Sequence, residues 1–153
     1  MVVTGLDRDG LERMWRTGED VAGNGLDAFV DADGGWPLRC CLTDSAPGGR
    51  VAVVAWNPYP WTGPYAETGP VVVHAAPCAG PATTGVPPQF LTRPQRLRPY
   101  GRDRRIAYPL IRLVDGDGSL PDAVAELLAH DEVDFVQARN VAAGCYSFTV
   151  RRG

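Results

Sequence analysis

The most regular alternation of apolar and polar residues lies at the C-terminal end of the chain. In CYSFTVRR, residues 145–152, large apolar side chains alternate with small polar ones, as in a strand that turns one face to the core. The preceding stretch DFVQARN, residues 134–140, also fits a strand. We therefore predict two strands here, with Cys145 on the face that carries the hydroxyl groups.

Helical spacing is clearest between Leu120 and Leu128. Apolar residues recur there at intervals of three and four, after a helix start signal at Ser119 and Asp122. His130 follows at the end of this predicted helix, where a cation is favoured by the helix dipole. We interpret His130 as a surface residue.

A shorter amphipathic helix is predicted near the N-terminus. Asp9 and Glu12 are spaced as in a capping box. Leu11, Met14 and Trp15 then recur at helical spacing and would face the core.

Four strands are predicted in the first half of the chain. Residues 26–33 fit a weak strand, and residues 36–44 and 50–56 flank the turn sequence APGG, which predicts a β-hairpin. The stretch GPVVVHA, residues 69–75, is apolar on both faces, so we expect it to be central in its sheet.

Proline marks the irregular parts of the chain. Residues 56–65, WNPYPWTGPY, predict a rigid aromatic loop, because their prolines exclude a helix or a central strand. Residues 77–101 predict a long wrapping connection with one helical turn near residues 89–91. Residues 105–116 predict a strand that contains Pro109 and is therefore at an edge or bulged.

These elements predict an α+β protein. We expect a single domain, residues 1–153, with a mostly antiparallel curved sheet of six or seven strands and two main helices on one face. The chain shows no internal repeat and no linker.

Composition and charge exclude several functions. All 15 basic residues are arginine, so lysine-dependent Schiff-base chemistry and a phosphate-loop lysine are excluded. Nucleotide-binding and serine-hydrolase motifs are absent as well. No apolar run is long enough for a membrane helix and the N-terminus lacks a secretory signal, so we expect a cytoplasmic protein.

One short segment is strongly basic. Residues 93–105 carry a net charge of +5, although the whole chain carries −3. A basic segment on an acidic body argues against nucleic-acid binding and is compatible with a local site for an anion. A solvated arginine-rich loop is the equal alternative. The sequence does not determine the oligomeric state.

Several short motifs, taken in order, resemble a known family. They are Pro-x-Arg at 37–39, PYxxxGPVVVH at 64–74 followed by Cys78, Leu-Arg-x-Tyr at 97–100, and NxxxGCY at 140–146. The chain resembles the bacterial domain-of-unknown-function family 1203 over nearly its whole length. The family usually has Pro-Cys-Arg at the first motif, where this chain has Leu38. The resemblance implies a compact cytosolic protein and no known activity.

His74 and Cys78 form the first candidate site. Imidazole and thiolate are both zinc ligands, but two ligands are too few, and Cys145 or Cys41 would have to complete the set. In the predicted strand 36–44, Cys40 and Cys41 point to opposite faces. The sequence also has no C-x-x-C or H-x-x-x-H motif and no nearby acid cluster. Because two ligands are too few, a buried, hydrogen-bonded His74 is preferred to a metal ligand, and Cys78 is interpreted as structural.

Three other sets of residues are candidates. Cys145 follows Gly144 and is either a nucleophile or, more simply, a structural thiol. Arginine and tyrosine side chains suited to an anion, or to salt bridges with the many acids, are Arg39, Arg98, Tyr100 and Arg139. The aromatic loop, which includes Trp61 and Tyr65, would wall a ligand or form a small outer core.

Our leading hypothesis is a small cofactor-independent enzyme, of isomerase, cyclase or lyase type, that acts on an anionic small molecule. His74, Cys145 and Tyr65 would be catalytic, and the substrate would be bound by Arg39, Arg98, Tyr100, Arg139 and Trp61. No metal, cofactor, nucleic acid or membrane is required. The alternatives are a non-catalytic binding module, for a small molecule or a protein, and a metal or thiol-redox protein that uses His74, Cys78 and Cys145.

Overall fold

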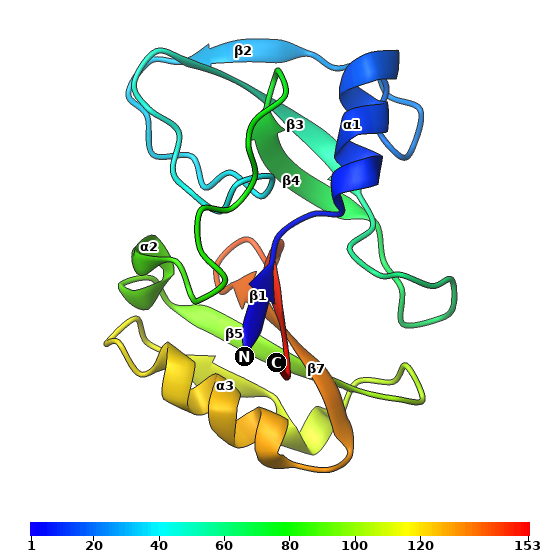
Figure 1. Cartoon of the computed structure of the whole chain (residues 1–153), viewed down its shortest axis with the longest axis vertical. Coiled ribbons are helices and arrows are strands. Elements are labelled where there is room, and N and C mark those ends of the chain that lie inside the picture. The colour runs from blue at the N-terminus through cyan, green and yellow to red at the C-terminus, as the bar shows by residue number, and fades with distance from the viewer. The chain divides into compact units, whose positions relative to one another are not determined.

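The computed structural model describes residues 1–153 and divides into two compact units. Unit 1 comprises Met1–Thr4 and Thr83–Gly153, and unit 2 comprises Gly5–Ala82 (Figure 1). Together they contain eight strands, three α-helices and one short 3-10 helix, with every named strand pair antiparallel. The predicted α+β class is confirmed. The strands form two sheets, and the prediction of a single domain is not tested by this division.

Unit 1 is built on a five-stranded sheet with the order β1-β8-β7-β5-β6. Its strands are β1 (Val2–Thr4), β5 (Gln95–Gly101), β6 (Arg112–Val114), β7 (Val133–Asn140) and β8 (Tyr146–Arg151). Helix α3 (Leu120–Ala129) packs on β7 and β5 with the apolar stripe that the sequence predicts (Figure 1). The short helix α2 (Pro88–Leu91) adds Phe90, whose ring lies edge-to-face on Phe148 at 4.9 Å.

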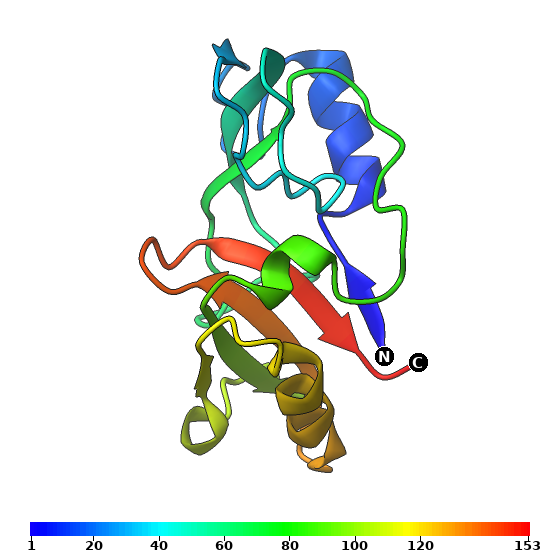
Figure 2. The ribbon, with the colours of Figure 1, turned by 90° about the vertical axis from the view of Figure 1, so that its left-hand side faces the viewer.

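Unit 2 contains a three-stranded sheet with the order β2-β3-β4. Its strands are β2 (Ala28–Asp31), β3 (Gly49–Trp56) and β4 (Gly69–His74). Helix α1 (Arg8–Thr17) lies beside this sheet (Figure 2), and it is close to the sheet at Gly10, where an added Cβ would meet the Trp56 ring at 2.9 Å. Leu11 and Met14 of α1 are buried, as their spacing predicts.

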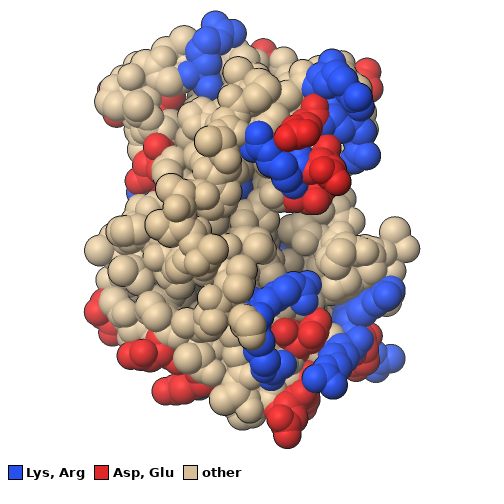
Figure 3. Space-filling model, in the orientation of Figure 1, with Lys and Arg blue, Asp and Glu red and all other residues tan.

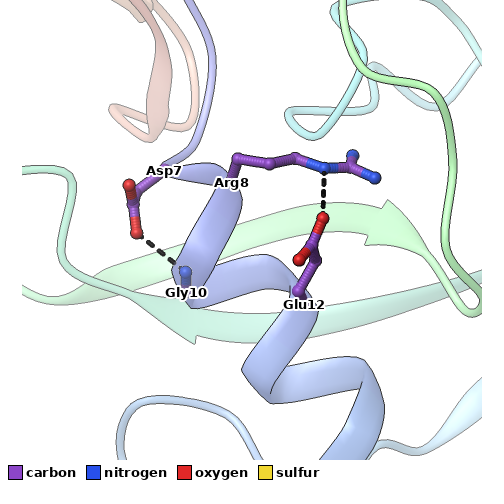
Figure 4. A network of polar contacts seen from close by, with 4 residues as sticks. All are labelled: Asp7, Arg8, Gly10 and Glu12. Carbon is purple, nitrogen blue, oxygen red and sulfur yellow. Dashed lines mark hydrogen bonds and ion pairs between the residues drawn. The ribbon is translucent and has the colours of Figure 1, made fainter.

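The start of α1 differs from the prediction by two residues. Asp7, not Asp9, is the N-cap, and its carboxylate accepts a hydrogen bond of 2.8 Å from the Gly10 N–H (Figure 4). Glu12 pairs with Arg8 one turn earlier instead of reaching back to the cap (Figure 4). An earlier aspartate at the correct spacing therefore takes the capping position.

The hairpin predicted from residues 36–44 and 50–56 is wrong. Residues 37–44 fold back on themselves, with an isolated bridge between Pro37 and Asp44, and β3 pairs with β2 and β4. Strand β4 is also not central, because beyond it lies only one isolated bridge, from Leu38 to Val72. The apolar residues on both faces of β4 therefore do not indicate a neighbouring strand on each side.

Two errors in the second half of the chain come from proline. The predicted 77–101 connection ends early, because Gln95–Gly101 is strand β5 with Pro99 inside it. The predicted strand at 105–116 is split into a 3-10 helix, Tyr108–Leu110, and the edge strand β6. The predicted helical turn near 89–91 and the edge position of β6 are confirmed. None of the helices is both long and apolar enough to cross a membrane.

Candidate functional site: a thiol–imidazole cluster

Four potential metal ligands meet at one end of the sheet in unit 2. Cys40, Cys41, His74 and Cys78 each offer one ligand atom, and all four atoms lie within 4.8 Å of one another. We call this set the thiol–imidazole cluster. Cys40 and Cys41 are buried, and His74 and Cys78 are partly exposed. All the cysteines are free thiols.

A tight turn brings Cys40 and Cys41 into the cluster. The Leu38 N–H donates to the Thr43 carbonyl at 2.8 Å, and the Leu42 N–H donates to the Leu38 carbonyl at 3.0 Å. Closing this turn puts buried Leu42 at a φ of 57°, in the left-handed region that non-glycine residues seldom occupy. The two cysteines therefore do not diverge as they would in a strand.

Strand β4 anchors this turn and also supplies His74. The Arg39 N–H donates to the Val72 carbonyl at 2.8 Å, which ties the turn to the middle of β4. Two residues further along, the His74 N–H donates to the Cys40 sulfur at 3.3 Å. From α1, the Trp15 indole N–H donates to the His74 carbonyl at 2.9 Å. The backbone of His74 is thus fixed from both sides, and Cys78 follows in the loop after β4.

The two adjacent thiols have opposite acidities. The hydrogen bond with Cys41, together with burial, raises the pKa of Cys40 above its ordinary value. The same hydrogen bond lowers the pKa of Cys41 to about 5, and the Thr43 hydroxyl, 3.0 Å from the Cys41 sulfur, contributes to the decrease. Of the two sulfurs, Cys41 is therefore the one that more readily becomes a thiolate.

The donor set and its dimensions fit zinc. Zn²⁺ in proteins is bound by four cysteine or histidine ligands in a tetrahedron, with Zn–S near 2.3 Å and Zn–N near 2.0 Å. Sulfur atoms at two corners of such a tetrahedron are then about 3.8 Å apart. The observed limit of 4.8 Å between ligand atoms requires only a small contraction around an ion.

The other predicted residues of unit 2 lie outside the cluster. Arg39 is buried, and its guanidinium donates to the Pro37 carbonyl. Trp61 lies in the aromatic loop, edge-to-face with Tyr59 at 5.4 Å, and Tyr65 is half-buried in the same loop. The predicted aromatic loop is confirmed as irregular structure.

Unit 1 holds the remaining predicted residues. Arg98 and Tyr100 share one face of β5, as predicted, and the Arg98 guanidinium lies 3.4 Å from the Tyr100 hydroxyl. On the neighbouring strand β7, buried Arg139 donates to the Gln137 side-chain oxygen at 3.1 Å and to the Gly144 carbonyl at 3.1 Å. The structure therefore brings Arg98, Tyr100 and Arg139 to adjacent strands of one sheet.

Cys145 is also in unit 1 and is not a member of the thiol–imidazole cluster. It begins the return into β8, after Gly144 at a φ of 71°, and its carbonyl accepts from the Asn140 N–H at 3.0 Å.

The arginine-rich segment of unit 1 does not form a uniformly basic surface. Arg102 and Arg105 line a pocket of about 380 Å³ together with three acids, Asp103, Asp131 and Glu132. Figure 3 shows positive and negative side chains interleaved in this part of unit 1, not one continuous blue patch. This mixture favours the solvated-loop interpretation over an anion site at residues 102–105.

Sequence reasoning undervalued Cys40 and Cys41. It considered His74 and Cys78 together, and the structure places them close to each other, but it preferred a structural Cys78. It also placed the two adjacent cysteines on opposite faces of a strand that does not exist. The usable signal in the sequence was Pro37, three residues before the cysteine pair. The isolated bridge that closes this segment is visible only in the structure.

The fold and the site thus define this chain as an α+β protein with a thiol–imidazole cluster of four residues. The chain belongs to the family described as protein of unknown function (DUF1203), whose model matches residues 35–152 and so includes all four cluster residues. No curated protein and no solved structure matches the chain.

Proposed function

We propose that this protein binds one zinc ion in the thiol–imidazole cluster, through the thiolates of Cys40, Cys41 and Cys78 and the imidazole of His74. The observation that carries the proposal is the convergence of four soft ligand atoms within 4.8 Å from three separate segments. Such a convergence is uncommon for unpaired thiols unless a metal or a disulfide uses it, and all four cysteines are free.

The surroundings of the cluster support this proposal. A backbone N–H bonded to a ligand sulfur, as from His74 to Cys40, orients the sulfur and stabilises its thiolate form. The Thr43 hydroxyl contacts the Cys41 sulfur in the same manner. A bound ion would also link the Cys40–Cys41 turn, the end of β4 and the loop that carries Cys78, and would thereby stabilise unit 2.

The proposal modifies the metal alternative drawn from the sequence, because Cys40 and Cys41 replace Cys145. It also competes with the enzyme hypothesis, in which His74 is a general base or acid. A histidine nitrogen bound to zinc cannot accept a proton, so His74 cannot perform both tasks through the same nitrogen. The enzyme hypothesis and the binding-module hypothesis stay predictions, because no contact in the structure favours either of them.

Cobalt substitution tests the proposal. Co²⁺ occupies tetrahedral zinc sites and gives visible absorption bands whose intensity reports tetrahedral geometry, and a near-ultraviolet band that reports thiolate ligands. We expect titration of the reduced protein to saturate at one Co²⁺ per chain with both bands, and zinc to displace it. His74→Ala should weaken Co²⁺ binding, whereas His130→Ala, at the exposed end of α3, should not. Octahedral bands alone, or no saturation, would reject the proposal.

A further inference from the structure

The thiol–imidazole cluster is open on one side. A pocket of about 310 Å³ lies at the end of β4 and is lined by His74 and Cys78, by residues 75–77, and by Ala28 and Arg50. Cys40 and Cys41 do not line it, and these two residues are only 1% and 8% exposed. Anything that reaches a metal in the cluster from solvent through this pocket meets His74 and Cys78 first.

Arg50 gives this pocket its chemical character. It is the only charged residue among the lining residues, which are otherwise alanine, proline and the two cluster members. Arg50 takes part in none of the ion pairs of the chain. Its backbone is held at the pocket, since Arg50 pairs with Val30 of β2 and the Arg50 carbonyl accepts from the Ala75 N–H at 3.1 Å.

Cys78 is the most replaceable member of the cluster. Cys40 accepts from the His74 N–H, Cys41 contacts Thr43, and His74 belongs to β4. Cys78 lies in a segment without helix or strand and is partly exposed. An incoming donor atom would therefore exchange with the Cys78 sulfur at the least cost to the fold.

We infer that the pocket binds a small anion that carries both a thiol and a carboxylate, with its sulfur on the metal and its carboxylate on Arg50. This inference rests on the proposed metal site. In the exchange, the incoming thiol replaces the Cys78 thiolate on the metal, and its proton passes to the Cys78 sulfur, so that no oxidant or reductant is needed. The volume suits a molecule of about the size of an amino acid, and a guanidinium is the preferred partner of a carboxylate.

The test compares a charged and a neutral thiol on the Co²⁺-loaded protein. Mercaptoacetate and 2-mercaptoethanol have similar sulfur chemistry, but only mercaptoacetate carries a carboxylate. We expect mercaptoacetate to change the visible Co²⁺ bands at about a tenth of the concentration that 2-mercaptoethanol requires, because a charge-assisted hydrogen bond to an exposed arginine is worth about one factor of ten. After desalting, the cobalt should remain with the protein.

Two variants locate the effect. Arg50→Met should remove the preference for mercaptoacetate, while Arg16→Met, an exposed arginine at the end of α1, should retain it. In the wild type, mercaptoacetate should also raise the alkylation of Cys78 by iodoacetamide, read by peptide mass mapping, with little change at Cys40 or Cys41.

The outcomes separate this inference from the proposed function. If the protein forms no tetrahedral Co²⁺ site, both fail. A normal Co²⁺ site that responds equally to both thiols, responds identically in Arg50→Met, or loses its cobalt to mercaptoacetate, overturns the inference and leaves the metal site standing.

Discussion

The two units of the chain each gather polar side chains on a sheet, but they satisfy those side chains differently. In unit 1, Arg139 donates to the Gln137 side chain and to the Gly144 carbonyl, and Arg98 lies beside the Tyr100 hydroxyl. The Arg139 Nε and the Gln137 Nε2 atoms are buried without a hydrogen-bond partner, so these polar groups are only partly satisfied. In unit 2, three sulfur atoms and an imidazole converge with only weak sulfur hydrogen bonds between them and the protein.

This difference bears on where function is to be sought. Arginine and amide groups that bond to each other stabilise a fold without any ligand. Thiols gain little from hydrogen bonding, so a cluster of them has much more to gain from a metal ion than from its own contacts. The contrast supports the proposal that the thiol–imidazole cluster binds a metal, and it favours a structural role for the arginine–tyrosine network.

The largest expected effect separates the cysteines of the two units. Cys78→Ser should weaken zinc binding by more than 100-fold, because loss of even an outer partner of a metal ligand costs about 10–100-fold. Cys145→Ser, the matched change in unit 1, should alter it less than about 2-fold. Competition with a chromophoric chelator measures both. Equal affinities in the two variants would remove the distinction between the units.

Metal removal should produce the next largest effect. Zinc at a thousand times its dissociation constant stabilises the folded state by about 4 kcal/mol. For a chain of this size, that corresponds to a fall in Tm of roughly 8–16 °C when zinc is removed. Differential scanning calorimetry with and without a chelator measures the change. The Cys78→Ser protein is the control, and at the same zinc concentration its Tm should fall by no more than about 3–6 °C, since a 100-fold weaker site keeps at most about 1.4 kcal/mol of the stabilisation.

A change in the unit 1 network should affect stability and leave zinc binding unchanged. Gln137→Met keeps the side-chain volume at a fully buried position but removes the acceptor for Arg139. We expect a loss of about 1–3 kcal/mol in urea unfolding, since a buried charged donor loses a partner. Arg96→Met, on an exposed site of β5, should cost much less. A change in zinc affinity in Gln137→Met would contradict the assignment of this network to structure.

The smallest effect concerns Asp20, which holds the loop after α1. Partial burial alone would raise its pKa, but hydrogen bonds from the Asn24 side chain and from the N–H groups of Ala55, Asn24 and Ala22 outweigh burial and lower it. A lowered folded-state pKa means that the stabilisation is present above the unfolded value, near 3.9, and is lost as the pH falls through the folded value.

Asp20→Ala should therefore destabilise the protein at pH 7 by about 1 kcal/mol or less, because the site is largely exposed. The difference from wild type should shrink as the pH falls below about 4. Urea unfolding at several pH values measures it, with Asp27→Ala, an exposed aspartate of unit 2, as the control. A difference that grows on acidification would show that the carboxylate does not act in this way.

The sequence predicts the regular elements better than it predicts their partners. Helix α3 follows from its apolar spacing, and β8 from its alternation, because both signals are local. The fold of residues 37–44 could not be read in the same way, since Cys40 to Leu42 fit a strand by composition. The turn has a left-handed Leu42 and a bond from the Arg39 N–H to the Val72 carbonyl, and this bond is a contact distant in sequence.

The candidate site was predicted in part for the same reason. His74 and Cys78 are four residues apart, at the end of a strand that the sequence identifies correctly. Cys41 was one of two possible partners, and Cys145 was the other. The choice between them depends on how the Cys40–Cys41 turn packs against β4, which the sequence does not show. In the structure both adjacent cysteines lie near His74, and Cys145 lies in unit 1.

The most direct test of the central claim is native mass spectrometry of the reduced protein as purified and after addition of zinc, with the denatured mass as reference. The account predicts a single species heavier by one zinc ion, less the protons that its thiols release, and the loss of that species in Cys78→Ser but not in Cys145→Ser. A wild-type protein that keeps its apo mass at micromolar zinc would contradict the claim that the thiol–imidazole cluster is a metal site.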